Sequence, residues 1–201
     1  MNLAKNPRHN LTWQRALPYV LLTAGLVGLT ASFFLTLDKI NLLQNTTFKP
    51  ACDLNPIISC GAVMKSNQAN TFGVPNSVFG LIAFSALTVL GVAVLAGATF
   101  KRWFWLAAQV AATAGILAMH YLFFEDVFRI HAICPWCFSV WMVTIPTYFG
   151  ITIYNIRAGN LGTARVVKAI SKYSNDILVL WYLIIFAVLL IRFWYYWKTL
   201  L

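Results

Sequence analysis

The chain has 201 residues, of which 60% are hydrophobic and only 10% are charged, and its mean hydropathy is +0.73. A globular domain carries about 25% charged residues, so this composition excludes an ordinary soluble protein. The formal net charge of +10 could suit nucleic acid, but Lys and Arg lie in short loops between apolar blocks. Basic loops of that kind report orientation in a membrane, and we expect no nucleic-acid partner.

The first apolar block predicts a membrane span over residues 16–37, because about 20 apolar residues cross a bilayer core. It is longer than the apolar region of a signal peptide, and no cleavage site of small residues precedes the polar loop, so we expect it to be uncleaved. Asp38 and Lys39 mark its expected end. A polar stretch, residues 38–72, follows. Its apolar residues at 57–64 predict a short helix on the membrane surface.

Four more apolar blocks predict further spans, at residues 77–100, 103–124, 133–156 and 177–191. Alanines at three- and four-residue spacing in the block 103–124 predict close packing against other helices in lipid. Residues 101–102 and 125–129 are expected to be short turns. The fold class is therefore an all-α integral membrane protein in contact with lipid.

The residues after the last apolar block predict how the chain is anchored in the membrane, and the charges of the loops predict its orientation. Aromatic residues at 193–197, between Arg192 and Lys198, predict an anchor in the membrane interface. The N-terminus and the loops on its side, including the basic loop 157–175, hold nine Lys and Arg residues against six on the other side. The positive-inside rule then makes the N-terminus cytoplasmic. All four cysteines fall on the extracytoplasmic side, where disulfides persist.

Cys134 and Cys137 open the block 133–156, with Pro135 and Trp136 between them. Cysteines at positions i and i+3 lie on one face of a helix, and the N-terminal end of a helix stabilises a thiolate. Pro135 suits the first position of that helix. The pattern is typical of a redox-active dithiol at the edge of a bilayer.

Cys52 and Cys60 lie eight residues apart in the polar stretch, and Asn55-Pro56 supplies a turn between them. A local, exposed disulfide of this kind exchanges readily with an incoming thiol. Two other interpretations of the four cysteines stay open. One is a zinc site with four cysteine ligands, which the spacing of this pair disfavours, and the other is a pair of static structural disulfides.

Two histidines have alternative interpretations. His120 lies inside the third block, where a polar side chain either serves the function or hydrogen-bonds a neighbouring helix. His131, three residues before Cys134, either transfers protons or is a solvated loop histidine.

The order of these features resembles the vitamin K epoxide reductase family. The matching residues are Cys52-Asp53, Ile58-Ser59-Cys60, Val63, Ser66, Asn76-Ser77-Val78-Phe79-Gly80, Cys134 and Cys137. The resemblance implies a four-helix transmembrane bundle around a quinone in residues 1–156, with the shuttle cysteines in the loop 38–76. Residues 157–201 would then add a basic cytoplasmic loop and a fifth transmembrane helix.

The resemblance also implies a role for each cysteine. Cys52 would exchange with the thiols of a partner, and Cys60 would pass the electrons to Cys134. Cys137 would face the quinone. Because no thioredoxin-like domain follows the fifth span in this sequence, we expect the partner to be a separate protein.

Three further residues are implied in quinone binding. Asn76 would hydrogen-bond a quinone carbonyl, with helix capping as the alternative, and Ser66 would lie near it. Trp141 stands where vertebrate enzymes carry a tyrosine that helps bind the quinone. Its indole N–H can donate a hydrogen bond but cannot accept one.

The expected function is a quinone-dependent thiol–disulfide oxidoreductase of a bacterial inner membrane. It would reoxidise a DsbA-like, thioredoxin-fold protein for disulfide formation in exported proteins, with menaquinone, ubiquinone or a vitamin K type quinone from the membrane pool as its cofactor. The alternative in the same fold is a vitamin K epoxide or quinone reductase, against which Trp141 weighs. The alternative of another class is a structural membrane protein with zinc or static disulfides. We expect no metal at the site.

Overall fold

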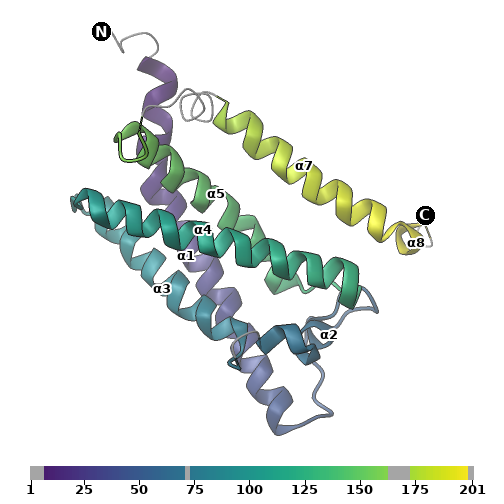
Figure 1. Cartoon of the computed structure of the whole chain (residues 1–201). Helices are drawn as coiled ribbons and strands as arrows, with labels where there is room; N and C mark the ends of the chain where they lie inside the picture. Colours follow the sequence, from purple (N-terminus) through teal and green to yellow (C-terminus); the bar gives the residue numbers. More distant parts are fainter. Residues whose placement is uncertain (1–6, 71–72, 163–172, 199–201) are drawn as a thin grey trace.

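The structure is a computed structural model that describes residues 7–70, 73–162 and 173–198 (Figure 1). Its elements are α1 (Pro7–Gln44), α2 (Cys60–Lys65), the 3-10 helix η1 (Asn67–Asn70), α3 (Asn76–Leu95), α4 (Arg102–Phe124), the π-helix η2 (Glu125–Ile130), α5 (Pro135–Arg157), α7 (Ser174–Arg192) and α8 (Trp194–Trp197). In these residues, five helices are long and apolar enough to cross a membrane. The protein is therefore an all-α, multi-pass integral membrane protein, as predicted.

Helix α1 is the centre of the bundle, because it packs against α3 on one side and α5 on the other, and α5 in turn packs against α4. The contact between α1 and α3 is close at glycines. A Cβ atom on Gly91 would lie 2.6 Å from the backbone nitrogen of Leu22, and one on Gly25 would overlap Thr88. These glycines let the two backbones approach.

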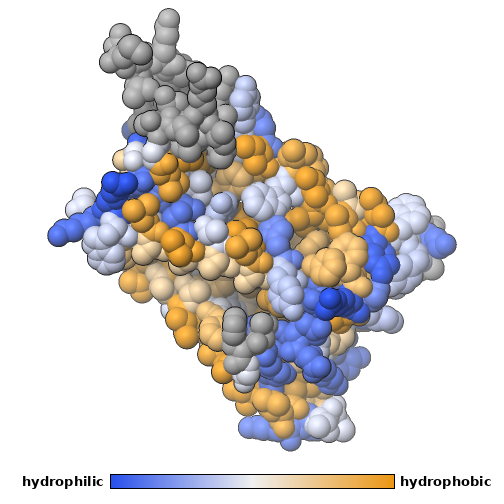
Figure 2. Space-filling view, viewed as in Figure 1, coloured by the Kyte–Doolittle hydropathy of each residue, from blue (hydrophilic) through white to orange (hydrophobic). Residues whose placement is uncertain are grey.

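Helix α4 packs in the bundle, as its alanines predicted, but on one face only, where Ala108 and Ala112 lie against the core cluster that contains Leu21 and Trp105. Ala107 and Ala111 are exposed, and a Cβ atom on Gly115 would meet nothing within 4 Å. Hydrophobic residues spread over the outer surface of the bundle, as Figure 2 shows. Since Val89 and Val110 on that surface are 68% and 70% exposed, it suits contact with lipid rather than with another helix.

Three predicted boundaries at the cysteine-bearing end were wrong. Helix α1 does not end at Asp38 and Lys39 but runs on to Gln44, because Lys39 Nζ donates a hydrogen bond to the Met64 carbonyl of α2 at 2.6 Å. Residues 125–130 form a π-helix that continues α4 rather than a turn. The predicted surface helix is reduced to α2, and Ile58 instead forms a bridge with the segment before α5.

Helix α7 lies along the side of the bundle (Figure 1). It contacts α5, and one of the contacts involves the turn of α5 that contains Pro146. Pro146 has no N–H, so the Met142 carbonyl four residues earlier lacks its helical donor. The Tyr182 hydroxyl of α7 donates to that carbonyl at 2.6 Å. The fifth helix therefore compensates for the proline in the fourth.

The interface anchor predicted at residues 193–197 is only partly correct. Trp194 is 55% exposed and begins the short helix α8, but Phe193 is 0% exposed and belongs to the hydrophobic core. Most of the predicted basic loop, residues 163–172, lies outside the described residues.

Candidate redox site

Two side chains shape the loop that carries the first cysteine pair. Asp53 Oδ1 accepts hydrogen bonds from Ser59 Oγ at 2.9 Å and from the Gly61 N–H at 2.7 Å. Asn55 Oδ1 accepts from the backbone N–H groups of residues 57 and 58 at 2.9 and 2.7 Å. These bonds satisfy backbone donors at the start of α2 and at the turn before it, and so hold the loop in one conformation.

A backbone bridge joins this loop to the segment that precedes α5. The Ile133 N–H donates to the Ile57 carbonyl at 2.6 Å, and the Ser59 N–H donates to the Ile133 carbonyl at 3.1 Å. The bridge aligns residues 57–59 with residue 133 in parallel. As a result, the residues that follow on each side, Cys60 and Cys134, lie next to each other.

The four sulfur atoms lie in one series from the loop to the start of α5. Cys52 and Cys60 form a disulfide, and Cys134 and Cys137 are free thiols. The Cys134 thiol lies 3.3 Å from the Cys60 sulfur, and both residues are 0% exposed. Cys134 caps α5, and its sulfur accepts a hydrogen bond from the Cys137 N–H at 3.4 Å. Pro135 is the first residue of that helix, as predicted.

Cys137 lines a cavity of about 70 Å³ at the mouth of the bundle. A cavity of about 150 Å³ holds one benzene ring, so this space has to widen to admit a ring of that size. Its wall is mainly apolar, with polar groups that include Lys39, Ser66, Asn76 and Asp126. The structure thus brings Cys137, Ser66 and Asn76 to one cavity.

The polar groups of this wall have defined partners. Asn76 is the first residue of α3 and not its cap, and its Nδ2 donates to the Gln68 carbonyl at 2.7 Å. Ser66 Oγ donates to the Val63 carbonyl at 2.7 Å. Apolar walls with an amide donor and a thiol match the chemistry of a quinone, which has flat apolar faces and two carbonyl acceptors.

Trp141 is not brought to this cavity. It is 3% exposed and lines a separate space of about 10 Å³ together with His120 and Phe123 of α4. In the described part of the chain, its Nε1 atom has no hydrogen-bond partner. Although Trp141 lies one turn after Cys137, it faces α4 and α7, whereas Cys137 faces the cavity beside α1 and α3.

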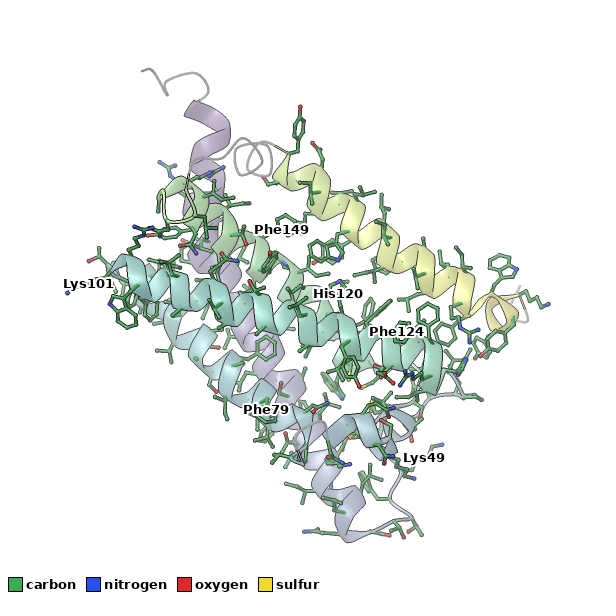
Figure 3. All side chains as sticks on the ribbon, in the orientation of Figure 1. Lys49, Phe79, Lys101, His120, Phe124 and Phe149 are labelled. Carbon is green, nitrogen blue, oxygen red and sulfur yellow. A yellow bond between two sulfur atoms is a disulfide. The ribbon has the colours of Figure 1, made fainter. Side chains whose placement is uncertain are left out.

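The two histidines lie outside the cavity. His120 projects from α4 toward α7 (Figure 3), where the Trp181 indole N–H donates to its Nε2 at 2.9 Å. Of its two interpretations, the structure supports hydrogen bonding to a neighbouring helix. His131 is exposed, and its Nε2 is in contact with Arg192 of α7.

Sequence reasoning missed two residues of the cavity wall, Lys39 and Asp126. Lys39 was predicted to end the first span, and Asp126 was predicted to lie in a short turn. A signal was present for Asp126, because it follows an apolar block directly and an acidic residue within membrane-spanning structure is costly unless it serves a purpose. Asp126 is 3% exposed.

Residues 19–153 of the chain match the Vitamin K epoxide reductase family. The matched region contains all four cysteines and the residues around the cavity, and it ends within α5, before α7 begins. No curated protein is significantly similar to the chain.

Proposed function

Because the chain belongs to the vitamin K epoxide reductase family, we propose that it is a quinone-dependent thiol–disulfide oxidoreductase. Family membership identifies a membrane redox enzyme. The finer assignment is that the protein reoxidises a separate DsbA-like, thioredoxin-fold partner during disulfide formation in exported proteins. We place the catalytic unit in residues 1–156 and the membrane in a bacterial cell, with the cysteines on the extracytoplasmic side.

The observation that carries this proposal is the unbroken line of sulfur atoms from the loop to the cavity. Cys52 is partly exposed, its disulfide partner Cys60 is 3.3 Å from Cys134, and Cys137 lines the cavity. A relay needs neighbouring sulfurs within reach of thiol–disulfide exchange, one end accessible to a protein and the other accessible to a membrane acceptor.

The cycle begins when the dithiol of the partner reduces the Cys52–Cys60 disulfide. The Cys60 thiolate then attacks the Cys134 sulfur of an oxidised Cys134–Cys137 pair, and Cys137 leaves as a thiolate. Attack of Cys52 on Cys60 reforms the first disulfide and frees Cys134. Two electrons have then moved from the loop to Cys134 and Cys137, which is the pairing found in this structure.

The cavity residues have separate tasks in this proposal. Asn76 would donate its amide N–H to a quinone carbonyl, Ser66 would border the ring, and the apolar wall would exclude water. A bound quinone supplies an acceptor for two electrons and two protons. Cys137 holds the electron-rich sulfur at the cavity, and Cys134 closes the disulfide with it when the electrons leave.

The test is electron transfer by purified protein from a reduced thioredoxin-fold partner to a ubiquinone or menaquinone analogue, followed by quinone absorbance. We expect quinone reduction by the native chain and none by Cys137→Ala. The matched variant Cys134→Ala should leave an unpaired Cys137 thiolate, visible as a charge-transfer absorption band with added quinone. Unchanged quinone reduction by Cys137→Ala would refute the proposal.

Metal analysis of the same preparation tests the structural alternative. A zinc site built from the four cysteines needs four thiolate ligands, and two of the four sulfurs here are joined to each other. We therefore expect less than stoichiometric zinc. One zinc ion per chain, bound by the four cysteines, would replace the redox assignment with a structural one.

A further inference from the structure

Two adjacent carboxyl groups on η2 are buried, but they have different surroundings. Glu125 is 1% exposed and forms an ion pair with Arg129, whose Nη1 lies 3.1 Å from Glu125 Oε1. Asp126 is 3% exposed and lines the same cavity as Cys137. Among the described residues, no hydrogen bond or ion pair forms to the Asp126 side chain. Its carboxyl group is therefore available to the cavity.

Of the other groups that can carry charge, Lys39 and Cys137 line the cavity with Asp126. Further charged groups, titratable groups and thiols on η2 and the elements near it include Glu125 and Arg129 on η2, His131 just after it, Asp38 on α1, Lys65 on α2, His120 and Tyr121 on α4, Cys134 on α5, and Arg192 on α7. The cations among them have other partners or face solvent. Lys39 donates to the Met64 carbonyl, Arg129 pairs with Glu125, Arg192 contacts His131, and Lys65 is exposed.

This environment makes formation of a Cys137 thiolate beside a carboxylate costly. Two negative charges in a space of low dielectric repel each other strongly, and no cation in the described residues is committed to Asp126. Moving the thiol proton onto the carboxylate keeps the net charge of the pair constant. A buried site favours proton transfer that creates no additional charge.

We propose that Asp126 and Cys137 share one proton through the cavity that both line, with no direct hydrogen bond between them, and that Asp126 is the residue that carries the thiol proton into the cavity. This inference rests on the proposed function and adds the proton path to it. When Cys134 and Cys137 become a disulfide, two S–H bonds break, one S–S bond forms, and two electrons and two protons leave for the quinone. Asp126 takes one of those protons from Cys137 Sγ, delivers it to the cavity, and ends the cycle as it began.

The first test uses the fully reduced protein in detergent, without quinone or partner. Iodoacetamide alkylates thiolates, and mass spectrometry with fragmentation quantifies the product at Cys137. A pair that shares one proton titrates as a unit, so the native rate should change less than about threefold between about pH 6 and 8. In Asp126→Asn the thiol titrates alone, and its alkylation rate should rise about tenfold per pH unit.

Two matched variants complete this test. Glu125→Gln alters the adjacent buried carboxyl, which Arg129 engages, and should keep the native profile. Asp126→Glu keeps a carboxyl group and should restore the plateau. A native rate that itself rises about tenfold per pH unit would overturn the inference without any variant. Equal slopes in the native chain and Asp126→Asn would overturn it too.

A second readout separates this inference from the proposed function. Loss of a proton-transfer residue lowers a rate by about 10²–10⁴-fold, so quinone reduction by Asp126→Asn should fall by at least about 100-fold and recover in Asp126→Glu. If the native chain reduces quinone but the alkylation profiles are equal, the inference fails and the function stands. If the plateau is present but the native chain reduces no quinone, the function fails and the shared proton stands.

Discussion

Buried polar side chains lie at both ends of α4 and α5, but the two ends use them differently. At the end near Lys101, labelled in Figure 3, Asn155 Nδ2 donates to the Trp105 carbonyl at 3.0 Å and to Gln109 Oε1 at 3.2 Å. Asn155 Oδ1 accepts from Asn160 Nδ2 at 2.8 Å. Both amide groups of the Asn155–Gln109 pair are thus used within the protein. We name this the Asn155 end.

At the cysteine end, which we define by the four cysteines, the polar groups line a cavity and do not pair with one another. Asp126 forms no ion pair in the described residues, and Lys39 bonds only a backbone carbonyl there. Paired amides in a membrane helix join one helix to the next. Unpaired ionisable groups beside a cavity are costly to keep and are the groups available for chemistry. The difference predicts that substitutions at the two ends affect different measurements.

The largest effect is expected at Cys134. Cys134→Ala removes the sulfur that connects the two cysteine pairs. It should lower the rate of electron transfer from partner to quinone by at least about 1,000-fold, because residues that act as one unit fail together when one is lost. The thermal unfolding midpoint should change little. Quinone absorbance and a thermal scan in detergent measure the two quantities. Electron transfer above one-tenth of the native rate would contradict the relay.

A smaller loss is expected at Asp53, which orders the loop rather than carrying electrons. Asp53→Ala removes the acceptor of the Ser59 hydroxyl and the Gly61 N–H. Hydrogen bonds to charged groups contribute about 1.5–3 kcal/mol each, so loosening the loop should slow electron transfer by about 10- to 100-fold. Asp53→Asn keeps one acceptor oxygen and should lose less. Equal electron-transfer rates in Asp53→Ala and Asp53→Asn would show that these loop hydrogen bonds do not control the rate.

At the Asn155 end, the expected change is in stability and not in rate. Asn155→Leu leaves the Gln109 oxygen and the Asn160 amide without their partner, and an unsatisfied buried group costs about 1–3 kcal/mol. Thermal unfolding in detergent should shift downward, while quinone reduction per folded molecule stays at the native value. If quinone reduction per folded molecule fell while the unfolding temperature stayed unchanged, the Asn155 end would serve catalysis and the proposed difference between the two ends would be wrong.

The smallest effect is expected where α7 meets α5. Tyr182→Phe removes one hydrogen bond, and such a bond contributes about 1 kcal/mol to stability. Pro146→Ala restores the N–H that the Met142 carbonyl lacks, so the tyrosine should then matter less. A double-mutant cycle on unfolding free energy measures that coupling. Additive effects would show that the two groups do not share the carbonyl.

The transmembrane helices were predictable because each apolar block is long enough to cross a bilayer. The predicted span 103–124 differs from α4 by one residue. The end of α1 was not predictable, because Lys39 is satisfied by the Met64 carbonyl from a distant part of the chain. The π-helix after α4 also has no local signal. The backbones of α1 and α3 approach closely at Gly25 and Gly91, which the sequence pattern did not single out, because packing partners decide which small residues matter.

The cysteine spacing indicated two pairs and the family resemblance implied the order of the sulfurs, but the rest of the site depends on the tertiary structure. Asp126 was assigned to a turn, and only the π-helix places it in the cavity wall. Trp141 was expected at the quinone because the family resemblance places it where vertebrate enzymes carry a tyrosine. The rotation of α5 turns its indole toward α4 instead.

The short bridge between residues 57–59 and Ile133 has a kinetic consequence. Two backbone hydrogen bonds hold the Cys60 and Cys134 sulfurs 3.3 Å apart, so each meets the other without diffusion. Well-oriented intramolecular groups react as though present at about 10⁵–10⁸ M. Exchange within the chain should then be fast, and turnover should be limited by arrival of the partner at Cys52 or by departure of the hydroquinone from the cavity beside Cys137.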